Sequence, residues 1–543
     1  MVQPTMSNKN QTKYIFVLGG VMSGLGKGIA ASSIGYLLKQ AKVRVTILKL
    51  DPYLNVDPGT MNPYQHGEVF VLDDGSETDL DLGHYERFID VNMTRDNNAT
   101  AGQIYSKVLE RERKGEYLGD TVQVIPHITD EIKDRIRAVN AHNNYDVIIC
   151  EVGGTVGDIE SLPFMEAIRQ FSLEVGYHNH MLVHVTLLPF VKASGELKSK
   201  PTQHSVMKLR EIGLSPDMIL CRSEFPIEQS VRDKIALFCN VLPNHVIEGR
   251  DVSSIYEVPL ALYKQNAGRL IKDRLKINKT PQLGALKKFI KNFNNPRHDV
   301  TIAMCGKYTE LIDSYKSVME AFVHAGVENN AMVNVKWVQT EKIKNQKEVE
   351  NVFSDINGVL ILPGFGSRGA EGKIRIANFA RKNKIPFLGI CLGLQCAVIE
   401  FARNVCNMEG SNSTEFNKKT RYPVIDLMES QRAIKIKGGT MRLGAYDCEI
   451  KTGTKTYAAY RKKNISERHR HRYEVNNRYK KELEKNGLIF SGINKELGVV
   501  ETIEVKDHPW YVASQFHPEL KSRVNKAHPL FREFIKAAVK ISL

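Results

Sequence analysis

Short apolar runs alternate, in both halves of the chain, with longer segments whose apolar residues recur at helical spacing. The runs predict buried strands, and their alternation with helices predicts parallel sheets covered by crossover helices. In the first half, Gly28–Lys42 is the expected helix between the first two strands. The expected strands are Tyr14–Leu18, Arg44–Leu50, Asp146–Cys150, Met181–Leu187 and Met218–Cys221.

The same alternation starts again near residue 300. The expected strands are Val300–Cys305, Met332–Val338, Gly358–Leu362, Pro386–Ile390 and Trp510–Ala513. The expected helices are Ser317–Ala325, Lys373–Lys382 and Leu394–Val405. The pattern therefore predicts an α/β chain with two doubly wound domains and mostly parallel sheets.

Residues 277–299 separate the two halves. They contain Pro281 and Gly284, but Leu286, Phe289 and Phe293 form one apolar helical stripe. Such a stripe is typical of a packed connector rather than a flexible tether. We expect domains at residues 1–278 and 299–543, joined by a linker at 279–298.

Composition narrows the class of protein. A chain of 543 residues is too long for one hydrophobic core. Residues 1–12 are polar, and no apolar run is long enough to span a bilayer, so we expect a cytoplasmic protein without a membrane partner. Eight cysteines without a CxxC pair argue against structural zinc and indicate a reducing compartment. The net charge of +15 fits nucleic acid, polyphosphate nucleotides or simply solvated lysines.

A glycine-rich loop, Gly19–Gly28, joins the first strand to the first helix. Glycines let the backbone approach an anion, the helix N-terminus offers free N–H groups, and Lys27 adds a positive charge. Gly28 replaces the Ser or Thr that usually follows this lysine, so the loop is a deviant Walker A sequence. The alternative is a plain tight turn, but strand, glycines, lysine and helix occur together.

Without that hydroxyl, a metal ion must be bound elsewhere. Asp79 and Asp81 lie in an acidic patch, Asp73–Asp81, which taken alone is better explained as a solvated acidic loop. Glu151 is the stronger candidate, because it directly follows a buried strand at the sheet edge where such folds bind ligands. These oxygen ligands suit Mg²⁺. Lys49 and the segments 153–160 and 198–203 belong to the same edge, which predicts a site for more than one polyphosphate.

A second candidate site has a thiol. Gly389-Ile390-Cys391-Leu392-Gly393 has the spacing of a nucleophile elbow, and a helix N-terminus lowers the pKa of a thiol. His517 and Glu519, two apart in an extended segment, project to one side, so Glu519 can orient an imidazole that takes the thiol proton. The loop Pro363–Gly366 could present N–H groups to an oxyanion.

The segment 468–473 alternates arginine and histidine. As a strand, it would place its histidines on one face and its arginines on the other, so that one arginine could bind a substrate carboxylate. No aromatic-rich basic surface accompanies it, which argues against a nucleic-acid partner.

Several long motifs resemble those of the CTP synthase family, and the second half resembles class I glutamine amidotransferases. The resemblance extends from about Lys13 to the C-terminal helix. Its motifs lie at residues 19–28, 49–61, 65–71, 79–87 and 468–476.

The resemblance implies ATP-dependent phosphorylation of the 4-oxygen of UTP, followed by displacement by ammonia from L-glutamine. Catalysis of glutamine hydrolysis is implied for Cys391, His517 and Glu519, and Mg²⁺ binding for Asp81 and Glu151. The implied ATP contacts are Gly24, Leu25, Gly26, Lys27, Gly28, Ile29, Lys49 and Asp81. The implied UTP and CTP contacts are Ser23, Asp158, Ile159, Glu160, Lys198, Ser199, Lys200, Pro201, Thr202, Gln203 and Lys234. The implied glutamine contacts are Gly364, Leu392, Gly393, Leu394, Gln395, Glu415 and Arg472.

The resemblance also implies activation by GTP, feedback inhibition by CTP, and a homotetramer that can form filaments. Pro363 stands where the family usually has the first of two glycines, which removes one backbone N–H from the expected oxyanion hole. The stretch 431–438 is shorter than usual, which leaves the strength of GTP activation open.

Three other functions compete with this interpretation. One is a different two-domain amidoligase, such as the cobyrinate amidating enzymes. Another is a nucleotide-gated scaffold or partitioning ATPase, in which a Cys-His-Glu set would have no use. The third is a basic nucleic-acid-binding protein, which a salt-dependent binding assay would reveal.

Overall fold

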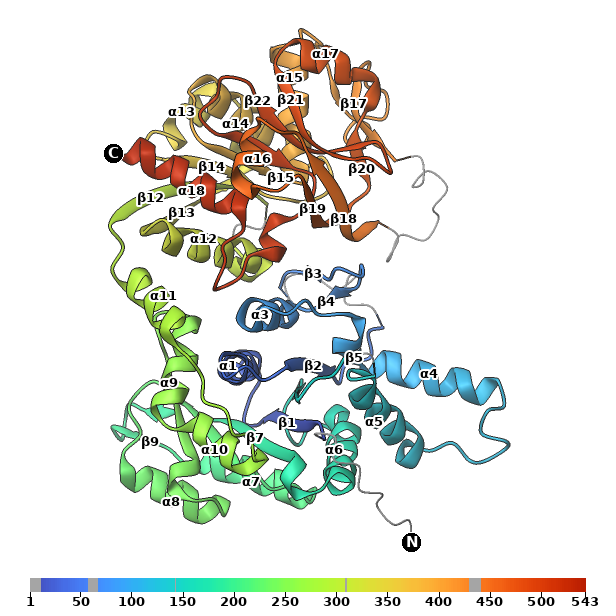
Figure 1. The fold of residues 1–543 in the computed structure, drawn as a ribbon, viewed down its shortest axis with the longest axis vertical. Coiled ribbons are helices and arrows are strands. Elements are labelled where there is room, and N and C mark those ends of the chain that lie inside the picture. Colours follow the sequence, from blue (N-terminus) through green and yellow to red (C-terminus); the bar gives the residue numbers. More distant parts are fainter. Residues whose placement is uncertain (1–10, 57–66, 142, 308–309, 429–440) are drawn as a thin grey trace. The chain divides into compact units, whose positions relative to one another are not determined.

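The computed structural model describes residues 11–56, 67–141, 143–307, 310–428 and 441–543 (Figure 1). The described chain divides into two units. The first holds residues 11–56 and 84–287, and the second holds residues 67–83 and 288–543. The domain limits expected from the sequence stay a prediction, and the sequence pattern contains no sign that residues 67–83 group with the second half.

The first unit is built on one parallel sheet of seven strands, in the order β11-β10-β7-β1-β6-β2-β5. Continuous apolar runs form these strands because both faces of the sheet are covered by helices. The strands are β1 (Lys13–Gly19), β2 (Val45–Asp51), β5 (Asn98–Thr100), β6 (Val147–Val152), β7 (His180–Leu187), β10 (Met218–Ser223) and β11 (Val246–Arg250).

Helices follow the strands of this sheet in the crossover manner expected of a doubly wound fold. The helices are α1 (Lys27–Gln40), α4 (Ala101–Arg113), α5 (Thr129–Ala138), α6 (Leu162–Val175), α7 (Lys200–Glu211), α8 (Gln229–Cys239), α9 (Val258–Lys264) and α10 (Ala267–Leu275). Helix α3 (Leu80–Ile89) follows the segment 67–79. Helix α11 (Gly284–Asn294) carries the predicted apolar stripe of the connector, and its Leu286 and Phe289 are buried.

The second unit contains a nine-stranded sheet in the order β13-β12-β14-β15-β23-β22-β21-β18-β19. Its first five strands are parallel, and the rest pair antiparallel. The parallel strands are β12 (His298–Gly306), β13 (Ala331–Gln339), β14 (Gly358–Ile361), β15 (Phe387–Ile390) and β23 (Tyr511–Ser514). The antiparallel strands are β18 (Arg442–Ile450), β19 (Asn464–His471), β21 (Leu488–Asn494) and β22 (Val499–Val505).

The helices of this unit include the three that the sequence predicts. They are α12 (Lys316–Glu328), α13 (Gln346–Val352), α14 (Ala370–Lys382), α15 (Leu392–Asn404), α16 (Lys455–Tyr460), α17 (Lys480–Lys485) and α18 (Pro529–Ser542). Every strand and helix expected from the apolar pattern is present within a few residues of its expected bounds. Two doubly wound units with mostly parallel sheets are confirmed, whereas the antiparallel half of the second sheet was not predicted apart from the strand at 468–471.

Residues 70–78 form a hairpin, β3 (Phe70–Val71) and β4 (Glu77–Thr78), that contacts β19. Arg468 Nε lies 2.5 Å from Asp73 Oδ1, and Arg470 Nε lies 2.7 Å from Glu77 Oε1. The arginine face of β19 is therefore paired with carboxylates from a segment almost four hundred residues earlier in the chain.

Among the described residues, no helix combines the length and the apolar character needed to cross a membrane.

Candidate active site

The thiol of Cys391 lies at a sharp turn between a strand and a helix. It follows β15 and forms the N-cap of α15 with φ 52° and ψ −101°, a strained conformation for a residue other than glycine. A Cβ on Gly389 would lie 2.9 Å from the carbonyl carbon of Gly393. A Cβ on Gly393 would lie 2.6 Å from the carbonyl oxygen of Ile361. The predicted nucleophile elbow, with glycines required on both sides of the thiol, is therefore present.

His517 and Glu519 follow β23, the strand that pairs with β15. His517 Nδ1 and Glu519 Oε1 are 2.7 Å apart, the hydrogen bond expected from the sequence. Burial alone would lower the pKa of His517, but the Glu519 carboxylate and the Cys391 thiol outweigh burial and raise that pKa to about 10. The imidazole is therefore protonated at neutral pH. An imidazolium beside the sulfur can stabilise a thiolate and later donate its proton.

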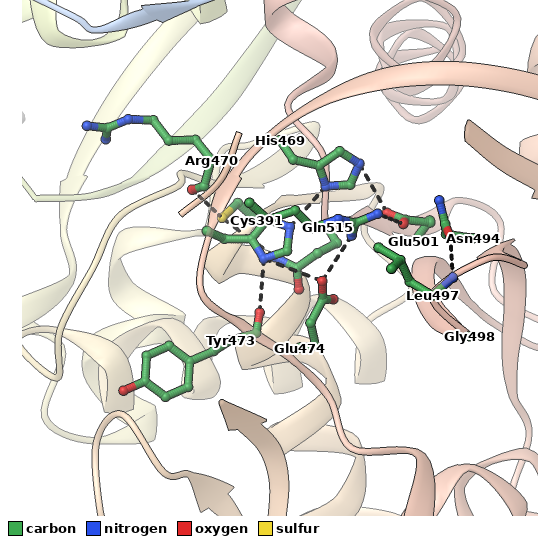
Figure 2. A network of polar contacts seen from close by, with 12 residues as sticks. Cys391, His469, Arg470, Tyr473, Glu474, Asn494, Leu497, Gly498, Glu501 and Gln515 are labelled. Carbon is green, nitrogen blue, oxygen red and sulfur yellow. Dashed lines mark hydrogen bonds and ion pairs between the residues drawn. The ribbon is translucent and has the colours of Figure 1, made fainter. Parts of the chain in front are cut away.

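Other groups surround the sulfur (Figure 2). Gln515 Nε2 donates to Cys391 Sγ at 3.7 Å, and Sγ lies 3.9 Å from the carbonyl oxygen of Arg470. The Cys391 N–H donates to the Ser514 carbonyl at 2.7 Å. The sequence analysis did not identify Gln515. The one signal that could have found it is its position two residues before His517.

The loop expected to form the oxyanion hole, Pro363–Gly366, follows β14 and is fixed at its start by a buried lysine. Lys373, on α14, donates from Nζ to the carbonyl oxygen of Leu362 at 2.8 Å. A Cβ built on Gly364 would lie 3.8 Å from the same ammonium. Burial lowers the pKa of Lys373 to about 8. The sequence did not single out Lys373, because on a helix pattern it looks like a solvated lysine.

Two further charged side chains fix the end of this loop. Lys307 Nζ donates to the Phe365 carbonyl at 2.7 Å, and the Gly366 N–H donates to Glu415 Oε1 at 2.6 Å. Burial raises the pKa of Glu415 and lowers the pKa of Lys307. Glu415, which the resemblance implied as a glutamine contact, is thus hydrogen-bonded to the loop Pro363–Gly366.

The other residues implied for glutamine binding lie on two elements of the second unit. The first turn of α15 holds Leu392, Gly393, Leu394 and Gln395, all buried. Gln395 Nε2 donates to the Tyr473 carbonyl at 3.1 Å and lies 3.4 Å from Gln515 Oε1. Leu394 belongs to the hydrophobic core. Arg472 is half-buried between β19 and β20 (Tyr473–Val475).

In the first unit, the glycine-rich loop joins β1 to α1 as predicted. Gly24 and Gly26 have φ values of +74° and +79°, in the left-handed region that favours glycine. Lys27 begins α1, and its Nζ donates to the Gly154 carbonyl at 2.6 Å. The first N–H groups of α1 and the Lys27 ammonium are suited to bind phosphate.

Lys49 and Glu151 form a buried ion pair on neighbouring strands β2 and β6, with Nζ and Oε1 2.9 Å apart. The Tyr85 hydroxyl, on α3, donates to the other carboxylate oxygen of Glu151. Glu151 thus has two buried polar partners, and its role as a metal ligand stays a prediction. Tyr85 was missed because nothing in an apolar helix pattern distinguishes it.

The residues implied for UTP and CTP lie on four segments of the first unit: Ser23, residues 158–160, residues 198–203 and Lys234. Asp158 Oδ2 accepts from the Thr155 N–H at 3.0 Å, whereas Ile159 is 81% exposed. Gln203 Nε2 donates to Ser199 Oγ at 3.0 Å at the start of α7. The exposed or half-exposed remainder comprises Ser23, Glu160, Lys198, Lys200, Pro201 and Lys234, and Thr202 is buried.

Asp81 lies in the first turn of α3. Three expected features fall partly or wholly outside the described residues. They are the motifs at 49–61 and 65–71, of which residues 57–66 are not described, and the shortened stretch 431–438.

The second unit thus joins a strained thiol to a His-Glu pair on the neighbouring strand of a doubly wound sheet, the arrangement of a class I glutamine amidotransferase. Residues 310–537 match the family model for glutamine amidotransferase class-I, and residues 13–277 match the model for the CTP synthase N-terminus.

Known relatives match almost the whole chain. The CTP synthase of Caldanaerobacter subterraneus is 57% identical over 532 residues, 98% of this chain and 99% of the relative. The CTP synthase of Methanocaldococcus jannaschii is 54% identical over 534 residues, which cover 97% of this chain and 98% of the relative. The glutaminase domain of Trypanosoma brucei CTPS, solved with bound acivicin, is 35% identical, with a TM-score of 0.42 over 44% of this chain and 94% of that one. The chain belongs to the CTP synthase family.

Proposed function

We propose that the protein converts UTP to CTP, using ATP and the amide nitrogen of L-glutamine or free ammonia. The observation that carries this proposal is the arrangement of Cys391, His517 and Glu519 in a chain that matches CTP synthases over nearly its whole length. The rival amidoligase, scaffold and nucleic-acid functions have no comparable support.

In the second unit, the Cys391 thiolate attacks the side-chain carbonyl carbon of glutamine, and the carbonyl oxygen becomes an oxyanion beside Gly364. His517 donates its proton to the nitrogen, and the C–N bond breaks to release ammonia and leave a thioester on the sulfur. His517 then takes a proton from water, which hydrolyses the thioester to glutamate. Glu519 holds the imidazole throughout. Arg472 and Glu415 bind the substrate carboxylate and amine.

In the first unit, ATP phosphorylates the 4-oxygen of UTP, because a carbonyl oxygen is a poor leaving group until it carries a phosphate. The Gly24–Gly28 loop with Ile29 binds ATP, and Lys27 and Lys49 stabilise the transferred phosphoryl group. Binding of Mg²⁺, which would neutralise phosphate charge, is proposed for Asp81 and Glu151 from family membership alone. The described residues contain no group of three or more His, Cys, Asp or Glu side chains suited to a metal, so phosphate oxygens would complete this site.

Binding of UTP, and of CTP as feedback inhibitor, is proposed for Ser23, residues 158–160, residues 198–203 and Lys234. Ammonia passes internally from the thiol site to the phosphorylated UTP, which keeps the activated intermediate away from bulk water.

Regulation and assembly are proposed from family membership. GTP activates glutamine hydrolysis, and the chain forms homotetramers, with filaments as a further state. The eight cysteines are free thiols, which supports action in the reducing cytoplasm.

The decisive experiment gives the protein UTP, ATP and Mg²⁺ with either glutamine or ammonium, and measures CTP by chromatography. Wild type should make CTP from both donors, and Cys391→Ala from ammonium alone. Cys396→Ala, which removes a buried thiol on the following helix, is the matched control and should use both donors. ATP hydrolysis without CTP from either donor would instead favour the rival amidoligase or scaffold.

A further inference from the structure

Strand β19 lies at one edge of the nine-stranded sheet, and this edge borders the thiol site. On its inner side the strand pairs with β18 from Asn464 to His471. On its outer side, the Arg468 carbonyl accepts from the His517 N–H at 2.8 Å. The Arg470 carbonyl on the same side lies 3.9 Å from Cys391 Sγ (Figure 2). The position of β19 therefore sets two backbone oxygens beside the catalytic thiol and imidazole.

Two arginines of β19 are held by acids of the hairpin at residues 70–78. Arg470 Nε lies 2.7 Å from Glu77 Oε1, in a pair whose side chains are largely buried. Arg468, which is fully buried, has its Nε 2.5 Å from Asp73 Oδ1. Removing one partner from a buried ion pair leaves an uncompensated charge, so these contacts constrain the strand more than exposed pairs would.

The hairpin is itself bound to the sheet through its backbone. The Ala445 N–H, on β18, donates to the Asp73 carbonyl at 2.9 Å. Gly444 has φ 93°, and a Cβ there would lie 2.7 Å from the Gly75 nitrogen, so glycine is needed where the two backbones meet. Hairpin, β18 and β19 all belong to the second unit. The acids therefore extend from a backbone that is fixed to the strand next to β19.

Arg470 also reaches the loop Pro363–Gly366, which is expected to form the oxyanion hole. Its guanidinium carbon lies 5.4 Å from the centre of the Phe365 ring, within the range of a cation–π contact. The Phe365 carbonyl accepts from Lys307 Nζ at 2.7 Å, so a cation holds each end of this residue. The side chain of Arg470 thus connects the hairpin with the loop, while its own carbonyl faces the thiol.

We propose that Glu77 is a positioning residue of the glutamine site: it holds Arg470 in place, and with it the carbonyl beside the thiol and the guanidinium beside Phe365. Asp73 has the corresponding role for Arg468, whose carbonyl binds the second catalytic residue. This inference rests on the proposed hydrolysis of glutamine at the thiol. A hairpin from the first half of the sequence thus completes the active site of the second unit.

Glu77→Gln is the first test, because the amide keeps the size of the side chain and removes its charge. A misplacement of about 1 Å can cost about a hundredfold in rate, so a partly released Arg470 should lower kcat for glutamine by about tenfold. KM should change less, because the carbonyl and the loop act on the reacting atoms. CTP formation from ammonium, which bypasses the thiol, should be unchanged. An equal loss with both nitrogen donors, or no loss with glutamine, would overturn the proposal.

A double-mutant cycle at one fixed GTP concentration tests whether Glu77 acts through Arg470. Arg470→Met should lower kcat for glutamine at least as much as Glu77→Gln does. Adding Glu77→Gln to Arg470→Met should then cause no further loss, because the acid has no guanidinium left to hold. A further loss as large as in wild type would contradict the proposal. Asp74→Asn is the matched control: it removes a charge from the exposed turn of the same hairpin, where the carboxylate accepts from the Ser76 N–H, and should act like wild type.

A structural measurement separates this proposal from the proposed function. In crystals of one form, the full-length Glu77→Gln variant should show the Arg470 carbonyl displaced from Cys391 Sγ by about 1 Å relative to wild type. The Phe365 ring should lose its contact with the guanidinium. Unchanged positions of both residues would refute the role of Glu77. If wild type released no glutamate from glutamine, the proposed function would fail, yet these positions would still decide whether Glu77 holds Arg470.

Discussion

The two candidate sites hold their reactive groups in different ways. At the thiol site, a strained backbone turn orients Cys391, and a buried hydrogen bond to Glu519 orients His517. At the phosphate site, the reactive cations are paired with groups of their own unit, Lys27 with the Gly154 carbonyl and Lys49 with Glu151. The thiol site is thus preorganised, whereas a phosphate must compete with existing partners for both lysines.

This difference determines what a substitution should do. At the thiol site, small geometric changes should remove glutamine hydrolysis and leave the use of ammonium intact. At the phosphate site, loss of one charge should affect both nitrogen donors and also the stability of the unit, because the partner charge remains buried.

Glu151→Gln should remove most of the activity of the phosphate site. The substitution removes a proposed metal ligand and the partner of Lys49, so CTP formation from ammonium should fall by about a thousandfold. Glutaminase activity, measured as glutamate release, should persist. Asp146→Asn, which weakens a partly exposed pair with Arg44, is the control and should act like wild type. Ammonium-dependent activity within tenfold of wild type would show that Glu151 is not part of the phosphate site.

Gly393→Ala should remove most of the glutaminase activity of the thiol site. Its new Cβ would lie 2.6 Å from the Ile361 carbonyl oxygen, so the elbow must shift and glutaminase activity should fall by about a hundredfold. Gly284→Ala is the control, since no atom lies within 4 Å of its Cβ position. CTP formation from ammonium should be unchanged in both variants; a parallel loss there would mean that the whole fold had been damaged.

Lys373→Met tests the support of the oxyanion loop. Without the ammonium, the Leu362 carbonyl loses its donor at 2.8 Å, and kcat for glutamine should fall by about tenfold with little change in KM. Lys382→Met, on the exposed end of the same helix, is the control. An effect confined to KM would indicate that Lys373 shapes ground-state binding instead.

Glu519→Gln should change the pKa of His517 more than it changes the structure of the thiol site. The charge of Glu519 helps to raise the pKa of His517, so NMR titration should show that pKa lowered by about one unit, equivalent to about 1.4 kcal/mol. The raised pKa of His517 stabilises the folded state. This contribution to the free energy of unfolding is fully present below about pH 6.5 and is lost as the pH rises through about 10. In the variant the loss should begin at lower pH. An unchanged titration would show that Cys391 alone sets the pKa.

The sequence was sufficient for the parallel parts of both sheets because continuous apolar strands and amphipathic helices are local signals. Cys391 and the His517–Glu519 pair were likewise found through short spacings. Apart from β19, the antiparallel half of the second sheet was missed because its buried strands contain charged residues, such as Arg442 and Glu501, which obscure the apolar pattern. Lys373 and Tyr85 were missed because their roles arise from partners distant in sequence.

The hairpin at residues 70–78 has a consequence for synthesis of the protein. Its Asp73 is paired with Arg468, 395 residues further along the chain. At ordinary rates of translation, roughly 5 to 20 residues per second, the hairpin leaves the ribosome some tens of seconds before its partner exists. During that interval its carboxylates have no native counterpart, so the second unit cannot be completed from the C-terminal half alone. A fragment that begins after the connector should expose the arginine face of β19 and require the hairpin to be supplied separately.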